Sequence, residues 1–354
     1  GAGKRNTRVE WGDHDSVAQS PTFATVADNT VVKSLTFVNT YNFPNKGKVN
    51  RNPRIPTVAA LINGDKCAFY SVGFSGVQDT LWDADGRHFF HRCTIQGAVD
   101  FIFGNGQSIY KVRYILTIHI TLYIPYDKPF IVIVGAGKRN TRVEWGDHDS
   151  VAQSPTFATV ADNTVVKSLT FVNTYNFPNK GKVNRNPRIP TVAALINGDK
   201  CAFYSVGFSG VQDTLWDADG RHFFHRCTIQ GAVDFIFGNG QSIYKKCVIN
   251  VLGATLKPGV AGYITAQGRT NPYDASGFVF TDNLVHGTGK AFLGRPWRSY
   301  ARLTFAEIGY YGSGSNTGRR VSWVKKLSGF SVQSMINLDF ITSGGWVQAL
   351  PISV

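Results

Sequence analysis

The stretch GVQDTLWDADGRHFFHRCTIQGAVDFIFG, residues 210–238, decides the fold because its pattern repeats along the chain. It contains two aspartates, Asp213 and Asp234. The interval between them recurs in the neighbouring pairs Phe203 and Phe224, Val206 and Cys227, Phe208 and Ile229, and Gly210 and Gly231. A period of about 20 residues with alternating apolar positions predicts a solenoid whose turns are β-strands.

The same period predicts that the two aspartates are neighbours in space. Equivalent positions on adjacent turns lie about 4.8 Å apart, so Asp213 and Asp234 would stand side by side. Two such carboxylates do not both ionise cheaply, and one pKa rises unless a cation intervenes. The pair therefore offers one proton donor and one anion. A purely structural pair that bonds one turn to the next is the alternative.

Composition favours a globular all-β protein with many turns. The chain has 354 residues, 43% of them hydrophobic, with 37 glycines and frequent runs of Val, Ile, Phe and Thr. Its formal charge of 37 − 23 = +14 predicts a polyanionic partner. Nucleic acid is disfavoured because the Lys and Arg are dispersed and no recognition motif is present. A membrane is disfavoured because no apolar run in the sequence is long enough to span a bilayer as a helix.

An unchanged internal repeat organises the chain. Residues 1–111 recur as residues 135–245. We expect residues 1–111 to be a partial, non-catalytic duplicate and residues 135–354 to be the catalytic solenoid. Residues 112–134 would join them as two strands around a turn at residues 125–129. Cys227 and Cys247, which fall one turn apart, could form a bridge between turns.

The second copy reads as a series of strands that ends in a short helical tail. A polar excursion at residues 175–190 reads as a surface loop. The tail becomes more helical over residues 332–338, which would suit a solenoid end cap. A set of strands is expected at residues 165–174, and further strands are expected at residues 191–196, 201–208, 222–229, 241–251, 262–267, 277–282 and 290–293.

Side chains near the aspartate pair suit ester chemistry on a sugar. The Gln212 amide could donate to a developing oxyanion. The Arg295 guanidinium could hold one aspartate ionised through a bidentate contact. Flat apolar faces suited to sugar rings, or alternatively to core packing, are offered by Trp216, Phe237 and Trp297.

Other site classes find little support. The histidines include no HExxH motif and no zinc-type Cys/His spacing, so no metal is expected. The GFSGV run at residues 207–211 misses the GxSxG elbow because it ends in valine. His222 and His225 are expected at the surface or in the core. A β-helix lyase or glycosidase acting on pectin is disfavoured, because such a lyase would need a calcium-binding carboxylate cluster and the sequence shows none.

Three ordered motifs resemble those of plant pectin methylesterases. They are QDTL at residues 212–215, DFIFG at residues 234–238 and LGRPW at residues 293–297. The resemblance runs through residues 124–354. It implies a right-handed parallel β-helix, hydrolysis of the C6 methyl esters of homogalacturonan without cofactor or metal, and a secreted, cell-wall location, although no signal peptide is visible. The implied partners are the acidic polysaccharide pectin and a proteinaceous pectinesterase inhibitor.

The resemblance also implies a role for each motif residue. Asp234 would attack the ester carbonyl. Asp213 would protonate departing methanol and then act as base for water. Gln212 would stabilise the oxyanion, and Arg295 would hold Asp234 ionised. Substrate would contact Trp297, Phe237 and Trp216, and also Thr191.

The chain departs from the family pattern in four places. Thr191 stands where the family often has glutamine, so one oxyanion donor is missing or replaced by a hydroxyl. The family's N-terminal turns, with a GxYxE motif, are not visible before Tyr126. A family strand is missing after residues 302–305, and no inhibitor-like pro-region is present. These losses make a catalytically impaired pectin-binding pseudo-enzyme the competing hypothesis.

The duplicate carries the pair without the arginine. Gln78, Asp79 and Asp100 correspond to Gln212, Asp213 and Asp234, but residues 1–111 end before any LGRPW motif. Two carboxylates with no cation would share a proton, which makes a poor nucleophile. We therefore expect the first copy to be catalytically silent.

Overall fold

The computed structural model describes residues 1–41, 43, 55–97, 100–111, 116–119, 121–175, 177, 189–301, 318, 337–342 and 345–350. Within these residues the chain forms β-strands and two short 3₁₀ turns, with no α-helix. No helix in the described part is long and apolar enough to cross a membrane. The all-β prediction is confirmed.

The chain divides into two compact units. The first unit comprises Gly1–Tyr114 and Asp127–Ala136, and the second comprises Ile115–Tyr126 and Gly137–Val354. The described residues of the connecting segment form three strands instead of the expected two, because β13 (Leu116–His119) and β14 (Leu122–Ile124) lie in different sheets. These two strands belong to the second unit, and β15 (Val132–Val134) belongs to the first.

Both units are built from three parallel sheets. In the first unit the strand orders are β1-β4-β7-β10, β11-β8-β5-β2 and β3-β6-β9-β12-β15. Its remaining strands are β1 (Arg8–Trp11), β2 (Phe23–Thr25), β3 (Val31–Lys33), β4 (Thr36–Asn39), β5 (Ala60–Ile62), β6 (Cys67–Tyr70), β7 (Gly73–Ser75), β8 (Leu81–Asp83), β9 (Arg87–His91), β10 (Thr94–Gln96), β11 (Ile102–Phe103) and β12 (Gln107–Lys111).

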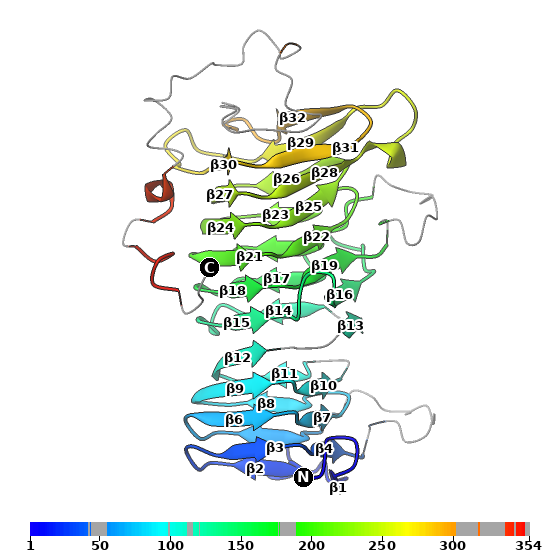
Figure 1. The fold of residues 1–354 in the computed structure, drawn as a ribbon, viewed down its shortest axis with the longest axis vertical. Coiled ribbons are helices and arrows are strands. Elements are labelled where there is room, and N and C mark those ends of the chain that lie inside the picture. The colour runs from blue at the N-terminus through cyan, green and yellow to red at the C-terminus, as the bar shows by residue number, and fades with distance from the viewer. Residues whose placement is uncertain are drawn as a thin grey trace. The chain divides into compact units, whose positions relative to one another are not determined.

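In the second unit the orders are β13-β16-β19-β22-β25-β28-β31, β14-β17-β20-β23-β26-β29-β32 and β18-β21-β24-β27-β30 (Figure 1). The strands are β16 (Thr141–Trp145), β17 (Phe157–Thr159), β18 (Val165–Lys167), β19 (Thr170–Asn173), β20 (Ala194–Ile196), β21 (Cys201–Tyr204), β22 (Gly207–Ser209), β23 (Leu215–Asp217), β24 (Arg221–His225), β25 (Thr228–Gly231), β26 (Val233–Gly238), β27 (Gln241–Lys245), β28 (Val248–Leu252), β29 (Gly262–Gln267), β30 (Gly277–Thr281), β31 (Leu284–Thr288) and β32 (Ala291–Pro296).

The register follows the period read from the sequence. Phe203 pairs with Phe224, and Phe208 pairs with Ile229, in parallel strands of consecutive turns. The following turn pairs Ile229 with Ile249. Each turn thus contributes one strand to each of three sheets, which is the parallel β-helix that the sequence predicted.

The prediction of single long strands at residues 201–208, 222–229 and 241–251 is wrong. Each of these segments is two strands in different sheets, and a residue with left-handed backbone lies between them. These residues are Ser205, Arg226 and Lys246, with φ of 53°, 55° and 54°. One such residue turns the chain at a solenoid corner and shifts the inward and outward alternation by one residue, because Phe203 and Phe208 both pack in the core although the interval between them is odd. The prediction of a single strand did not take this shift into account.

Aromatic rings stacked along consecutive turns fill the core of the second unit. The ring centroids of Phe203 and Phe224 are 5.0 Å apart, those of Phe224 and Tyr244 are 4.5 Å apart, and those of Tyr244 and Phe280 are 4.6 Å apart. Burial of each large side chain stabilises the fold by roughly 1.5–3 kcal/mol. A slip of register would break the whole stack.

The cysteine bridge is not formed. Cys227 and Cys247 are free thiols in the structure. Their sulfur atoms instead donate to main-chain carbonyls one turn back, of Phe203 at 3.3 Å and of Phe224 at 3.5 Å. Burial raises the pKa of the Cys247 thiol well above its usual value, so this thiol stays protonated.

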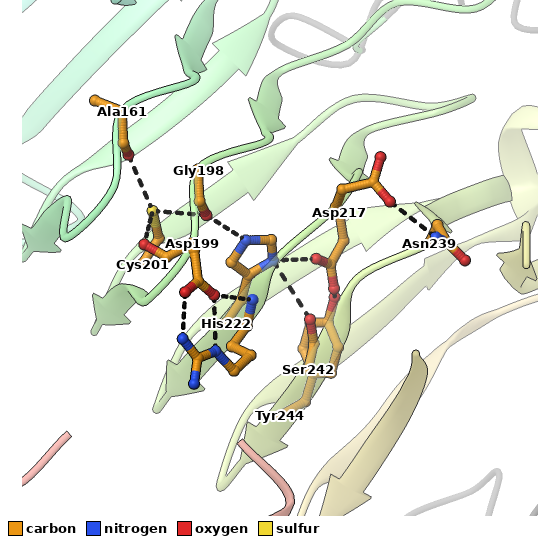
Figure 2. A network of polar contacts seen from close by, with 11 residues as sticks. Ala161, Gly198, Asp199, Cys201, Asp217, His222, Asn239, Ser242 and Tyr244 are labelled. Atoms are coloured by element: carbon orange, nitrogen blue, oxygen red, sulfur yellow. Dashed lines mark hydrogen bonds and ion pairs between the residues drawn. The ribbon is translucent and has the colours of Figure 1, made fainter. Parts of the chain in front are cut away.

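A buried polar network ties several turns together (Figure 2). Asp217 and His222 are fully buried, with the Nδ1 atom of His222 2.5 Å from the Asp217 carboxylate. The Tyr244 hydroxyl donates to the other carboxylate oxygen at 2.5 Å, and His222 Nε2 donates to the Gly198 carbonyl at 2.8 Å. Burial raises the pKa of Tyr244 well above its usual value, so it remains a donor. His222 is thus a core residue, and the network is structural.

The expected helix at residues 332–338 falls almost entirely outside the described residues. The described part of the tail contains a 3₁₀ turn at Leu338–Phe340, and a second such turn lies at Gly253–Thr255. The Gln241 side chain donates to the Phe340 carbonyl, and Trp346 Nε1 donates to the Ile341 carbonyl at 2.7 Å. Ile341 is fully buried, so this part of the tail packs against the solenoid next to β27.

Candidate functional site

The two aspartates lie on consecutive turns of the second unit. Gln212 forms a parallel bridge with Val233, and the Asp213 N–H donates to the Val233 carbonyl at 3.1 Å. Both aspartates have left-handed backbone, with φ of 58° at Asp213 and 47° at Asp234. Such a conformation costs roughly 1–3 kcal/mol at a residue other than glycine. The surrounding pairing therefore holds both carboxylates in a conformation that an isolated chain would avoid.

A register shift aims Asp234 at the next turns. Between β26 and β29, Val233 pairs with Tyr263 and Ile236 pairs with Thr265, so two residues oppose one. This is a β-bulge, a device that redirects side chains. Phe235 takes the fully buried position, whereas the Asp234 carboxylate meets Arg295 from β32, two strands further along the sheet.

Arg295 binds the Asp234 carboxylate through two nitrogen atoms. Its Nε donates to both oxygens, at 2.9 Å and 3.1 Å, and its Nη2 also contacts Oδ2. The Asp234 side chain is 11% exposed and the Arg295 side chain 46% exposed, so water screens the pair only from the arginine side. Bonding to Asp234 raises the pKa of Arg295.

Asp213 has the opposite electrostatic setting. Its burial, followed by the negative charge of Asp234, raises the pKa of the Asp213 carboxyl to about 7, and Arg295 partly opposes that rise. At neutral pH, Asp213 is therefore poised between its acid and base forms. The two neighbouring carboxyls therefore have different surroundings: Asp234 is bound by the Arg295 cation, whereas desolvation dominates at Asp213.

Three aromatic rings line this part of the sheet. The rings of Trp216 and Phe237 stack with centroids 5.3 Å apart, and Trp297 meets Phe237 edge-on at 5.7 Å. Trp297 is 44% exposed, whereas Phe237 is buried in a core cluster with Val192 and Ala266. The open faces therefore belong to Trp297 and the half-buried Trp216, and Phe237 supports them.

Thr191 lies beneath the surface. It is only 1% exposed, and its N–H donates to the Gln212 carbonyl at 3.2 Å. The backbone of Thr191 thus fixes the backbone of Gln212, whose side chain is half-buried. A direct substrate contact by Thr191 stays a prediction.

Sequence reasoning missed Tyr263, Phe292 and Arg298. The Arg295 guanidinium carbon lies 4.6 Å from the centre of the Tyr263 ring, and Phe292 stacks on that ring at 5.4 Å. Arg298 lies over Trp297 at 4.4 Å. The ladder that pairs Tyr263 with Phe292 joins positions further apart in the sequence than the repeat that relates Asp213 to Asp234. No regular spacing could have revealed it.

The first unit repeats the pair in a different setting. Burial and then the negative charge of Asp100 raise the pKa of Asp79 to about 6. Asp100 is exposed, and Gln78 is half-buried. In the described part of the chain, no arginine is paired with Asp100. The residues that define the site are thus present twice, but the cation is present once.

Within the residues that the structure describes, two clusters could hold a metal ion, and neither contains an aspartate of the pairs. They are residues 13–15 and 147–149, each reading Asp-His-Asp, with potential ligand atoms within 4.8 Å of one another. In the second, the Asp147 carboxylate already accepts the N–H groups of His148 and Asp149 at 2.7 Å and 3.3 Å. These contacts describe a local turn.

Comparison with known proteins gives a consistent result. The family model described as pectinesterase matches residues 1–123 and 117–307. Probable pectinesterase 29 of Arabidopsis thaliana is 61% identical over 78% of this chain and 90% of that protein. Probable pectinesterase 55 of the same plant is 60% identical over 74% of this chain and 88% of that protein.

Solved structures agree on the fold. The pectin methylesterase from carrot superposes with a TM-score of 0.60 and 25% identity, over 70% of this chain and 88% of that one. A pectin methylesterase in complex with hexasaccharide VII gives a TM-score of 0.56 and 22% identity, over 66% and 88% of the two chains. At that identity the second match supports the parallel β-helix alone.

Proposed function

Because this chain belongs to the pectinesterase family, a family of carboxylic ester hydrolases, we propose that it hydrolyses the C6 methyl esters of homogalacturonan to methanol and pectate. One observation carries the proposal. The Asp234 carboxylate is held in two places by Arg295, next to Asp213, a carboxyl whose pKa of about 7 allows it to give and take a proton. Ester hydrolysis through an acyl-enzyme needs this combination of an anion and an acid.

In the first half of the reaction, Asp234 attacks the ester. One of its carboxylate oxygens forms a bond to the C6 carbonyl carbon, and the carbonyl electron pair moves to oxygen. The Gln212 amide donates to that oxyanion. When the carbonyl re-forms, the bond to the methoxy oxygen breaks, and Asp213 gives that oxygen its proton. Methanol leaves, and an acid anhydride joins Asp234 to the substrate.

In the second half, water releases the product. The now ionised Asp213 removes a proton from water, and the hydroxide oxygen attacks the C6 carbonyl carbon of the anhydride. The bond to Asp234 breaks, which restores its carboxylate beneath Arg295. The product is a galacturonate carboxylic acid, which ionises to pectate. Asp213 ends protonated, as it began.

The substrate is expected to run past the exposed aromatic rings. Trp297 and Trp216 offer faces on which sugar rings can stack, with Phe237 beneath them. The net charge of +14 suits an acidic polysaccharide. We further propose that the protein acts in the cell wall after secretion and that a proteinaceous pectinesterase inhibitor can bind it.

The alternative of an impaired, pectin-binding pseudo-enzyme has a specific structural counterargument. That hypothesis rests on missing N-terminal turns, which would leave strand edges of the catalytic unit unpaired. In the second unit, β13 pairs with β16 and β14 pairs with β17, so two of the edges are covered. The connecting segment thus supplies part of a turn where the family's own turns are not visible.

Methanol release from highly methylated pectin tests the proposal. The comparison is between the intact chain, Asp234→Ala and Asp100→Ala. The two variants change the same residue type in identical local sequence, so Asp100→Ala is a matched control for Asp234→Ala. We expect Asp234→Ala to lose at least about 10³-fold in kcat and Asp100→Ala to behave as the intact chain. An intact chain that is folded but releases no methanol would favour the pseudo-enzyme.

A further inference from the structure

Tyr263 sits under the arginine of the site on the strand between its two partners. It belongs to β29, which pairs with β26, the strand of Asp234, and with β32, the strand of Arg295. The bulge in β26 leaves Tyr263 opposite Val233, directly before Asp234. The guanidinium carbon of Arg295 lies 4.6 Å from the centre of its ring.

A second ring holds Tyr263 in place. Phe292 pairs with Tyr263 in the β29–β32 ladder and stacks on it, with centroids 5.4 Å apart and planes inclined by 27°. Phe292 and Arg295 come from the same strand, so β32 contacts the Tyr263 ring with both side chains. Phe292 is 52% exposed, so one part of its ring is open to water while another part packs on Tyr263.

We propose that Tyr263, backed by Phe292, is a positioning residue that holds the Arg295 guanidinium in its bidentate geometry on Asp234. The arginine side chain is 46% exposed and long, and it loses rotamer freedom to hold this pose. A ring face under the guanidinium stabilises the pose through a cation–π contact and excludes water from one side of the group. Lysine would not replace such a stacked, bidentate arginine.

This inference rests on the proposed function, because the pose matters to catalysis only if Asp234 is the nucleophile. The ionisable side chains of this part of the site are Asp213, Asp234, Arg295 and Tyr263 itself. Among them only Arg295 lowers the pKa of Asp213. A guanidinium released from the Tyr263 ring would lower it less, and the Asp213 pKa would rise.

The experiment compares Tyr263→Leu with Tyr263→Phe, which keeps the ring and removes the hydroxyl. Tyr123→Leu on β14, a 57% exposed tyrosine of the same unit, is the control. We expect Tyr263→Leu to lower kcat for methanol release about 10-fold, the size of a partly desolvated cation–π contact, with KM nearly unchanged. Tyr263→Phe and Tyr123→Leu should stay within about two-fold of the intact chain.

The pH profile separates positioning from mere support of the fold. Asp213 must be protonated to release methanol, so its titration sets the alkaline limb of kcat. We expect this limb to move to higher pH in Tyr263→Leu and to return in Tyr263→Phe. A lower kcat with an unmoved limb would overturn the inference. If Tyr263→Leu does not fold, Phe292→Leu replaces it, with the same direction expected and the same result against it.

A measurement without catalysis keeps this inference distinct from the proposed function. Urea unfolding of Tyr263→Leu, Arg295→Met and the double variant forms a double-mutant cycle. Non-additive effects would support the contact even if the intact chain released no methanol, and only the proposed function would then fail. Additive effects would overturn the inference whatever the activity.

Discussion

Replacing Arg295 with methionine removes the cation from Asp234 while keeping a long apolar stem. The change deletes the donors that reach both carboxylate oxygens and leaves a carboxylate that is only 11% exposed beside a second one. A hydrogen bond to a charged group contributes about 1.5–3 kcal/mol. Because the guanidinium is 46% exposed, we take about 2–3 kcal/mol for the whole contact, or about 30- to 150-fold in kcat.

The assay is initial-rate methanol release across a range of pH, with Arg142→Met as the control. Arg142 on β16 forms an ion pair with Glu144, and the exposed fractions of these two side chains (40% and 11%) are close to those of Arg295 and Asp234, so removing Arg142 should leave kcat unchanged. In Arg295→Met the alkaline limb should move up, because Arg295 lowers the pKa of Asp213. A kcat within two-fold of the intact chain, in a folded variant, would refute the reasoning.

Three further changes test other parts of the structure. Asp213→Asn should abolish methanol release and flatten stability against pH. The Asp213 pKa is raised from 3.8 to about 7, so the folded state holds a proton that the unfolded state has lost, and stability falls as pH rises through this window, by roughly 2–4 kcal/mol in all. Urea unfolding at pH 4 and pH 8 measures this loss of stability. An equal loss between the two pH values in Asp213→Asn would contradict the raised pKa of Asp213. Asp217→Ala should destabilise the second unit by about 3–5 kcal/mol, because it leaves buried His222 and Tyr244 without their shared acceptor; a loss below about 1 kcal/mol in urea unfolding would disprove this. Trp297→Ala should raise KM for pectin with little change in kcat, and an unchanged KM would remove Trp297 from the binding surface.

The fold could be predicted because its repeat is local and periodic. Inward residues such as Phe203 and Phe224 recur at the spacing that the ladder uses, and the register of the structure follows that spacing. The corners were missed. Ser205, Arg226 and Lys246 have no residue type in common, so no single residue marks where the chain turns. The trace of a corner in the sequence is a one-residue shift of the alternation, as between the inward residues Phe203 and Phe208, and a prediction that leaves out this shift merges two strands into one.

The aspartate pair could be predicted, but the second layer of the site could not. Asp213 and Asp234 follow from the repeat, and Arg295 from its motif. Tyr263 follows from neither, because the bulge after Val233 and the longer excursion before β29 break the regular spacing. The buried Asp217, His222 and Tyr244 network was missed for a related reason. Polar residues are expected outside, and only the three-dimensional structure reveals that their partners lie on neighbouring turns.

The duplicated segment shows how little of the site is local. Asp100 and Asp234 are preceded by the same sequence, and each follows a partner aspartate by one turn. Only Asp234 is followed by β29 and β32, which bring Tyr263 and Arg295 to its carboxylate. In both copies burial, followed by the charge of the second carboxylate, raises the pKa of the partner aspartate, and Asp234 is buried whereas Asp100 is exposed. The QDTL and DFIFG motifs thus make a carboxylate pair in either copy, and we propose that a nucleophile arises only where two further turns of the solenoid bring an arginine to that pair.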